Sequence, residues 1–244
     1  MKDRLTITLN QKTIRAIDSI IDNLYIRNRS NAIEQLIERA LGENKTAVII
    51  AGGNEEELKV SPNEYRPTAK IGNMTVIELA VKKLRESGFR EIFVIARHFV
   101  IRDIFQVLGD GSKYGVKINY TEEGKSNGSA DSLRLLKGKI QTSFLVVFAD
   151  LIFNKTKIKE LWESHIKQRA IVTLMIGTSP INLKKAGIVK VEGNKIISFI
   201  EKPKLIDSGI YFSGIFIAEP EIFEYSGNSL EKEIFPALSE KGFL

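Results

Sequence analysis

Apolar and polar residues follow two different repeats along this chain, and the change between them lies near residue 42. At the start, apolar and polar residues alternate over residues 4–9, a repeat that is typical of a strand. Apolar residues then recur every three or four positions over residues 14–24 and again over residues 32–41, which predicts two amphipathic helices. Farther on, short apolar runs alternate with helical repeats. We therefore predict two domains, at residues 1–44 and 45–244.

The predicted strand and helices of the first domain need a second chain to stabilise them. We expect Asn10 and Ser30 to cap the two helices, because each side chain can accept a hydrogen bond from an amide of the first turn. A lone strand leaves its backbone groups unpaired, and about forty residues are too few for a stable monomeric core. Two chains that pair their strands in an antiparallel ribbon remove both problems. The sequence therefore predicts a homodimer that forms through this N-terminal ribbon.

The two faces of the predicted ribbon differ in chemistry. Ile7 and Leu9 would face the helices, whereas Arg4, Thr6 and Thr8 would face outward. Arginine can pair with guanine, and threonine can contact a base edge or a thymine methyl group. An outward face of this kind favours contact with DNA.

In length, helix phasing and turn, residues 2–42 resemble the ribbon-helix-helix family of DNA-binding proteins. The resemblance implies that the ribbon enters the major groove of double-stranded DNA and reads bases with its outward side chains. It also implies that the amides at Ser30, with Arg27 and Arg29 nearby, hold a phosphate. Two alternatives stay open: a dimerisation unit of the same fold without DNA binding, and a strand-helix-helix segment that packs on the rest of the chain.

The second domain shows an α/β pattern. Strands are predicted at residues 46–50, 91–96, 116–120, 144–148, 170–177, 188–191 and 195–200. Helices are predicted at residues 75–87, 100–108, 129–136 and 158–168. Strands that alternate with helices are typical of a three-layer α/β/α, Rossmann-like sandwich. We predict that fold class for residues 45–244.

Several short motifs follow one another in this domain. They are Ala47 to Gly53, Arg66-Pro67-Thr68, Gly128 to Leu133, Val146 to Asp150, Ala186 to Val189, Glu201-Lys202-Pro203, Ser213 to Phe216 and Leu230 to Glu233. In this order they resemble the nucleotide-sugar pyrophosphorylase (sugar-phosphate nucleotidyltransferase) family over about residues 47–240.

The resemblance implies a site in which a sugar-1-phosphate oxygen attacks the α-phosphorus of a nucleoside triphosphate. Positioning and electrostatic stabilisation carry most of such a reaction. It implies that Asp150 is a ligand for Mg²⁺, a cation that prefers oxygen ligands. The residues implied in ligand binding are Gly52, Gly53, Gly128, Asp150, Gly187, Glu201 and Lys202.

Other positions depart from the family pattern. Where the family has an arginine after the glycines, this chain has Asn54 followed by Glu55, Glu56 and Glu57. Carboxylates beside a triphosphate are repulsive by about 1 kcal/mol or more per close pair. Thr68 stands where we place the family's lysine, with Lys70 two residues on, and the sequence ends before the family's last aspartate segment. We therefore expect a domain that is shortened at its C-terminus and damaged in catalysis, with no residue assigned as catalytic.

Composition narrows the function classes. The chain has no cysteine, so it has no disulfide, thiol nucleophile or thiolate metal site. It has no apolar run of about 18 residues and no signal-peptide pattern, so we expect a cytoplasmic protein without a membrane span. The net charge of +6 indicates an acidic partner or, equally, a lysine-rich composition.

Three functions are compatible with this sequence. The first is a DNA-binding transcriptional regulator whose degenerate second domain senses a nucleotide, sugar phosphate or nucleotide sugar, or mediates assembly. The alternative is an active, Mg²⁺-dependent sugar-1-phosphate nucleotidyltransferase with an N-terminal dimerisation or DNA-binding unit. The third is an inert scaffold for the DNA-binding pair. The missing arginine and lysine favour the regulator.

Overall fold

The computed structural model describes residues 6–21, 26, 28–41, 45–53, 55–62, 64–124, 126–168, 170–178, 186–205 and 208–244. Contacts within the chain divide it into two compact units, Met1–Asn44 and Lys45–Leu244. Each unit is described by itself.

Two helices make up the described part of the first unit, α1 (Gln11–Asp18) and α2 (Arg29–Leu41). The predicted cap at Asn10 is confirmed, because its side chain accepts a hydrogen bond from the Thr13 amide at 2.8 Å. The two helices pack together. Ile17 of α1 and Ala32 of α2 are buried, so the helical repeats are amphipathic as predicted.

The prediction that Ser30 caps the second helix is wrong. Asn28 Oδ1 accepts a hydrogen bond from the Asn31 amide at 2.9 Å, and α2 begins at Arg29. An asparagine side chain satisfies a first-turn amide as well as a serine does. Asn28 therefore caps the helix, two residues before the predicted cap at Ser30. Ser30 is an exposed residue of the first turn.

The predicted ribbon is not present within one chain. Among the described residues 6–10, none forms a strand, and Ile7 and Leu9 are exposed and not packed beneath the helices. A ribbon of this kind forms only when a second chain supplies the partner strand. Arg4 and Arg27 lie outside the described residues, and Thr6 and Thr8 are exposed. The homodimer and its contact with DNA therefore stay predictions.

Arg29, a predicted phosphate contact, has a partner within the chain. Its Nε and Nη2 atoms donate to the two carboxylate oxygens of Asp18 at 2.6 and 2.8 Å. These hydrogen bonds, and then the charge of the guanidinium, lower the pKa of Asp18. The pair joins the end of α1 to the start of α2.

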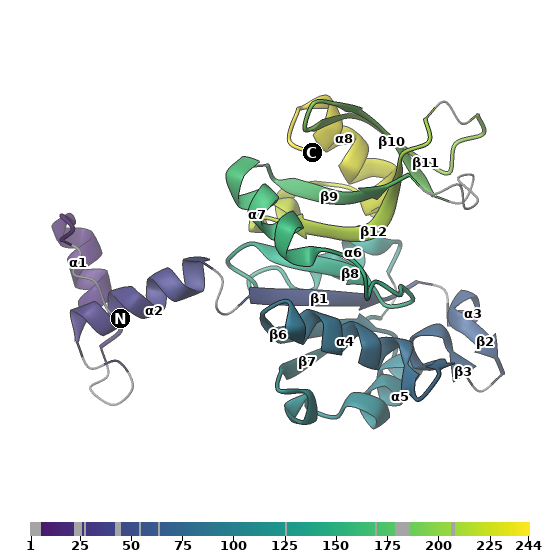
Figure 1. Ribbon diagram of the computed structural model, residues 1–244, viewed down its shortest axis with the longest axis horizontal. Helices are drawn as coiled ribbons and strands as arrows, with labels where there is room; N and C mark the ends of the chain where they lie inside the picture. Colours follow the sequence, from purple (N-terminus) through teal and green to yellow (C-terminus); the bar gives the residue numbers. More distant parts are fainter. Residues whose placement is uncertain are drawn as a thin grey trace. The chain divides into compact units, whose positions relative to one another are not determined.

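The second unit is built on one mixed sheet. Its strands are β1 (Lys45–Ala51), β6 (Phe89–Ala96), β7 (Lys117–Glu122), β8 (Phe144–Phe148), β9 (Val172–Gly177), β10 (Gly187–Glu192), β11 (Lys195–Glu201) and β12 (Tyr211–Ala218). Their order is β11-β10-β12-β8-β1-β6-β7, and β9 also pairs with β12. Figure 1 shows β1 in the middle of the sheet.

Alternating strands and helices predict a sheet of parallel strands, and only half of the sheet is parallel. β1 pairs in parallel with β6 and β8, and β6 pairs in parallel with β7. β12 runs antiparallel to β8, β9 and β10, and the predicted hairpin of β10 and β11 is confirmed. β12 is a strand that we did not predict, because its apolar run was interpreted only as a motif. The α/β class is confirmed, with a parallel-rich mixed sheet in place of a uniform one.

Helices cover both faces of the sheet. The longer ones are α4 (Val76–Glu86), α5 (His98–Leu108), α6 (Ser129–Arg134), α7 (Ile158–Gln168) and α8 (Phe235–Glu240). Side chains of β1 alternate between two cores: Ala47 and Ile49 pack with α4, α5 and α7, whereas Val48 and Ile50 pack with α6 and α8. A strand that is buried on both faces is typically a continuous apolar run, and β1 is one from Ala47 to Ala51.

Shorter elements complete the unit. They are α3 (Glu55–Leu58), η1 (Arg66–Thr68), η2 (Ser112–Tyr114), η4 (Pro220–Glu224), η5 (Leu230–Ile234) and two small hairpins, β2 (Lys59–Ser61) with β3 (Glu64–Tyr65) and β4 (Lys70–Ile71) with β5 (Met74–Thr75). Of these, η1 packs against α4 and α5, and η5 packs against α6, α8 and β11. These two elements bring side chains from loops to the edge of the sheet.

Candidate functional site

The carboxyl ends of the parallel strands meet at one edge of the sheet. The amide after β8, at Ala149, donates to Ile50 O at 2.9 Å, and the amide after β7, at Glu123, donates to Ala96 O at 2.8 Å. Gly52, Glu123 and Asp150 therefore lie at the same edge. This is the edge at which open α/β sheets bind ligands.

A buried carboxylate lies behind the two glycines that follow β1. Glu123 exposes only 2% of its surface. It accepts hydrogen bonds from the Gly53 amide at 3.3 Å and from the Ser132 hydroxyl. A Cβ atom at Gly52 would overlap Glu123 Oε2, so a side chain there would displace the carboxylate.

The sequence did not show which of two neighbouring glutamates faces this edge. Neighbouring side chains of a strand point to opposite sides, so only one can turn inward. Glu122 is exposed and lies 3.2 Å from His98 Nδ1, whereas Glu123 is buried. The predicted strand ended at residue 120 and β7 ends at Glu122, so the sequence did not rank Glu123 above Glu122.

Asp150 is paired with an arginine at the same edge. Arg66 Nη1 lies 3.2 Å from Asp150 Oδ2, and about half of the arginine side chain is exposed. Thr68, which we placed at the family's lysine position, donates its hydroxyl to Tyr65 O at 3.1 Å within its own turn. The hydroxyl of Thr68 is therefore engaged within its own turn, away from the role of the family's lysine. Arg66, two residues earlier, supplies a cation.

The residues around Asp150 fit a magnesium ion that arrives with a substrate. Among the described residues, no group of three His, Asp or Glu side chains is placed to hold a metal. Mg²⁺ commonly binds through one or two carboxylates together with substrate phosphates and water. Asp150 is one-third exposed, and its recorded hydrogen bond uses only Oδ2. One carboxylate with a free oxygen suits that mode of binding.

A second group of predicted residues lies where β10 begins and β11 ends. Gly187 pairs with Glu201 across the two strands. A Cβ atom at Gly187 would overlap the Phe199 ring and lie 3.1 Å from Glu201 Oε2. Lys202 Nζ lies 3.5 Å from Glu201 Oε1, and its backbone has φ +46°. Left-handed backbone at a residue other than glycine costs free energy and is concentrated at functional sites.

Burial raises the pKa of the Glu201 carboxyl, and the nearby charge of Glu231 raises it further. The ammonium group of Lys202 opposes both effects. The side chain of Glu201 exposes only 13% of its area. A carboxylate that is largely removed from water and has few hydrogen bonds within the protein is a strong acceptor for the hydrogen bonds of a ligand.

Replacing Glu201 by Gln should raise the melting temperature at pH 7. Because the pKa of Glu201 is higher in the folded chain than in the unfolded chain, its ionisation lowers stability as the pH rises through the interval between the two pKa values. Gln cannot ionise and escapes this loss. Thermal unfolding from about pH 7 down to about pH 4 should show the advantage disappear at the acidic end, where Glu201 is protonated.

The matched control is Glu192→Gln, which changes an exposed glutamate at the far end of the same hairpin. The ionisation of Glu201 would not be the cause if the melting temperature rose equally in both variants, or if its rise in E201Q did not depend on pH.

Gly128 lies where α6 meets the segment before η5. The Ala130 and Asp131 amides donate to Asn228 O at 2.9 and 3.3 Å, and a Cβ atom at Gly128 would lie 2.5 Å from that oxygen. The Ser129 hydroxyl donates to Glu231 Oε2 at 2.6 Å. Gly128 therefore makes room for a neighbouring backbone. Its contact with a ligand stays a prediction.

Aromatic rings connect the two groups of residues along the edge. Phe148 comes two residues before Asp150, and its ring centroid lies 6.4 Å from that of Phe212. Phe212 lies 6.0 Å from Phe199, the ring that covers Gly187. Through these contacts the Asp150 group and the Glu201 group belong to one continuous edge. Gly52, Gly53, Glu123, Arg66, Asp150, Gly187, Glu201 and Lys202 form the candidate site.

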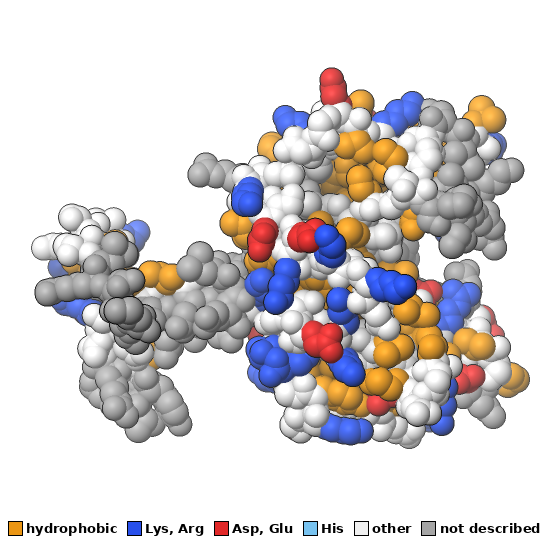
Figure 2. Space-filling model, in the orientation of Figure 1, with side chains coloured by type: hydrophobic (Ala, Val, Ile, Leu, Met, Phe, Trp, Pro, Cys, Tyr) orange, Lys and Arg blue, Asp and Glu red, His pale blue; other side chains and the backbone are white. Residues whose placement is uncertain are grey.

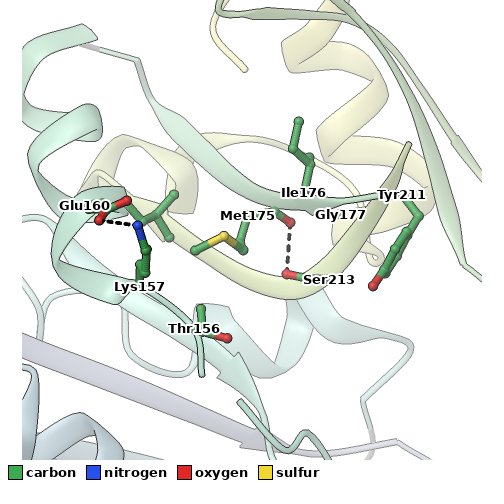
Figure 3. Close-up of a pocket in the computed structure, with 9 residues that line it drawn as sticks. Thr156, Lys157, Glu160, Met175, Ile176, Gly177, Tyr211 and Ser213 are labelled. Atoms are coloured by element: carbon green, nitrogen blue, oxygen red, sulfur yellow. Dashed lines mark hydrogen bonds and ion pairs between the residues drawn. The ribbon is translucent and has the colours of Figure 1, made fainter. Parts of the chain in front are cut away.

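A pocket of about 410 Å³ lies apart from these residues (Figure 3). It is lined by the start of α7 and by the ends of β9 and β12 that carry Met175 and Ser213. Figure 3 shows the Lys157–Glu160 ion pair at one side and the Ser213 hydroxyl donating to Met175 O at 2.9 Å. No residue of the candidate site lines this pocket among those described.

Charged side chains are mixed on the face of the second unit that Figure 2 shows. Lys and Arg side chains are scattered there, and Asp and Glu side chains lie among them. A nucleic-acid interface typically gathers its basic residues in a patch or stripe. On the described part of this face the positive charge is not gathered in that way.

Comparisons with known proteins identify the second unit. The family model described as nucleotidyl transferase matches residues 46–239. The chain belongs to this family. The matched residues do not include the first unit, so the ribbon-helix-helix resemblance of residues 2–42 receives no support from this comparison.

The names of two relatives mention sugar phosphates. A protein of Oryza sativa described as a mannose-1-phosphate guanylyltransferase is 28% identical over 204 residues, which cover 79% of this chain and 56% of the relative. A UTP–glucose-1-phosphate uridylyltransferase of Synechocystis is 28% identical over 218 residues, covering 81% of this chain and 56% of the relative. The chain thus spans about half the length of the curated relatives it matches.

A solved structure supports the fold. The Bacillus anthracis protein described as a glucose-1-phosphate thymidylyltransferase, crystallised with sucrose, matches with a TM-score of 0.69 and 24% identity over 74% of each chain. Among the described residues of this chain, no helix is both long enough and apolar enough to cross a membrane. Family and relatives together favour the enzyme alternative over the DNA-binding regulator that we first placed ahead of it.

Proposed function

We propose that this chain transfers a nucleotidyl group from a nucleoside triphosphate to a sugar-1-phosphate. A phosphate oxygen of the sugar-1-phosphate forms a bond to the α-phosphorus, the bond from the α-phosphorus to the β-phosphate oxygen breaks, and pyrophosphate leaves. The observation that carries the proposal is the Arg66–Asp150 pair at the edge of the sheet. The pair places a cation beside a carboxylate that could bind a metal, two residues before the Thr68 that stands at the family's lysine position.

The donor half of the proposed site is the edge next to β1. The bare backbone of Gly52 and Gly53 lets a triphosphate approach closely, as glycines after a first strand do in other nucleotide-binding folds. Arg66 would neutralise phosphate charge, because its guanidinium carries several fixed donors. Asp150 would hold the Mg²⁺ that accompanies the triphosphate, and this ion supplies charge stabilisation for the transferred group.

The acceptor half is the edge at β10 and β11. The buried Glu201 carboxylate suits the hydroxyl groups of a sugar, and the exposed Lys202 ammonium suits a phosphate. Gly187 has no side chain, which makes room for the Phe199 ring beside Glu201. The names of the relatives support a sugar-1-phosphate as the acceptor class.

The three glutamates after Gly53 argue against strong triphosphate binding, because like charges repel. One of them is already compensated. Glu56 Oε1 lies 2.6 Å from Lys59 Nζ. The pair reduces the net negative charge of this segment.

The test is a pyrophosphate-release assay of the full chain with Mg²⁺. GTP, UTP and dTTP are each combined with mannose-1-phosphate and glucose-1-phosphate. We expect turnover for at least one pair, dependent on both the metal and the sugar phosphate. Calorimetric titration of the same nucleotides accompanies the assay. Binding without turnover for every pair would overturn the proposal and favour a chain that binds the ligand without reacting it.

A further inference from the structure

Arg97 occupies a position at the candidate site that the proposed function has not used. It is the first residue after β6. Its neighbour Ala96 pairs with Ala51 of β1 and with Glu122 of β7. Arg97 therefore begins at the edge of the sheet between the two glycines and the buried Glu123.

The guanidinium of Arg97 has no hydrogen-bond or ion-pair partner among the residues that the structure describes. Its Nε atom is the buried side-chain nitrogen that lacks a hydrogen bond among the described residues. Arg97 is also the N-cap residue of α5, and its side chain makes no capping hydrogen bond. A polar atom that is buried without a partner lowers stability, so such atoms are rare and call for an explanation.

Other arginines of the unit show what is unusual here. Arg66 pairs with Asp150, Arg102 with Asp103 and Arg134 with Asp131, at 2.6 to 3.2 Å. Arg90 donates to Arg85 O at 2.9 Å. Arg97 follows the carboxyl end of β6, and within the described part of the chain it forms no ion pair with a carboxylate.

The proposed reaction needs a cation that the loop after β1 does not supply. That loop continues with glutamates. Helix α5 starts directly after Arg97 and packs against η1, the element that carries Arg66. Two arginines therefore approach the edge from adjacent elements, and one of them is already engaged by Asp150.

We propose that Arg97 binds the β- and γ-phosphates of the nucleoside triphosphate, the part that leaves as pyrophosphate. A guanidinium suits this role because its donors match phosphate oxygens in pairs. If the side chain turns toward the ligand, the Nε atom, which is buried without a partner in the free chain, would gain a hydrogen bond. The inference rests on the proposed function, since it assigns a phosphate-binding residue to the same site.

The experiment compares Arg97→Gln and Arg97→Lys with the unchanged chain. Arg102→Gln is the matched control, because Arg102 is an exposed arginine of α5 that pairs with Asp103. Calorimetric titrations with Mg²⁺ use GTP, UTP and dTTP, their monophosphates, and inorganic pyrophosphate. Thermal melting of each variant shows whether it is folded.

We expect Arg97→Gln to weaken binding of triphosphate and pyrophosphate by about tenfold to hundredfold, the range for a charge-assisted hydrogen bond. Monophosphate binding should change by less than about threefold, because it lacks the groups that Arg97 contacts. Arg97→Lys keeps the charge and should show an intermediate loss of binding. If the Gln variant does not fold, the comparison of Arg97→Lys with the unchanged chain tests the inference. Arg102→Gln should match the unchanged chain.

The outcomes separate this inference from the proposed function. If Arg97→Gln binds triphosphate as the unchanged chain does, or weakens monophosphate equally, the inference is wrong even where turnover is observed. If the unchanged chain binds triphosphate without turnover, the proposed function fails, and a selective loss in Arg97→Gln still supports the inference. If the unchanged chain binds neither triphosphate nor pyrophosphate, the inference is overturned.

Discussion

Asp150→Asn should reduce kcat for pyrophosphate release by on the order of 10²–10³-fold, the loss that follows removal of one preorganised electrostatic group from an active site. Asn has the same shape but no charge, so it leaves the fold intact and removes the carboxylate on which a metal would bind. It also leaves Arg66 without its ion-pair partner. Steady-state assays at saturating nucleotide measure the effect.

The matched control is Asp103→Asn, which removes the carboxylate of another Asp–Arg pair, on α5. It should leave kcat within about twofold, because an exposed ion pair contributes little. A similar loss of kcat in both variants would show that removing any Asp–Arg pair lowers activity, and that Asp150 has no special role. Turnover that persists in Asp150→Asn would remove this residue from the chemistry.

Arg66 allows a further test of whether the pair acts as a unit. If Arg66 and Asp150 serve the same phosphate and metal, a double replacement should cost less than the sum of the two single free-energy losses, because groups that act together are not additive. Additive losses would indicate that the arginine only holds the aspartate in place.

Much of the fold could be predicted because burial on two faces leaves a clear trace in the sequence. The continuous apolar runs of β1 and β8 are the trace of strands that are covered on both sides. The repeat over residues 158–168 gave α7 with its observed bounds, since its apolar face packs on the sheet. The antiparallel pairing of β12 with β8, β9 and β10 left no such trace, because pairing direction is set by distant strands and not by local pattern.

The site was predictable only in part. Asp150 could be placed because it follows an apolar strand, and the ends of parallel strands share an edge. The cation could not, because a short turn decides whether Arg66 or Thr68 faces Asp150. Glu123 could not be distinguished from Glu122 for a similar reason, since a shift of one residue along a strand reverses which side chain is buried. In the first unit, Asn28 and Ser30 are both able caps, and the sequence alone does not rank them.

Gly187→Ala should both destabilise the second unit and weaken the acceptor half of the site. The added Cβ atom would overlap the ring of Phe199. That ring is buried and packs against Phe212 and Phe235 at 6.0 and 5.3 Å between centroids, so it cannot retreat freely. Overpacking of this kind costs about 1–3 kcal/mol of unfolding free energy. Chemical denaturation of Gly187→Ala and of the unchanged chain measures this difference in unfolding free energy.

The same methyl group would lie 3.1 Å from Glu201 Oε2, which is why the effect should reach the substrate. We expect KM for the sugar-1-phosphate to rise by about tenfold or more, the result of roughly 1.4 kcal/mol of lost binding, while binding of the triphosphate changes little. Gly209→Ala is the control, because a Cβ atom there meets no atom within 4 Å. A loss of stability without a change in KM would separate Gly187 from the acceptor and leave it only a packing role. An equal rise in KM for both substrates would instead show that the two halves of the edge respond as one.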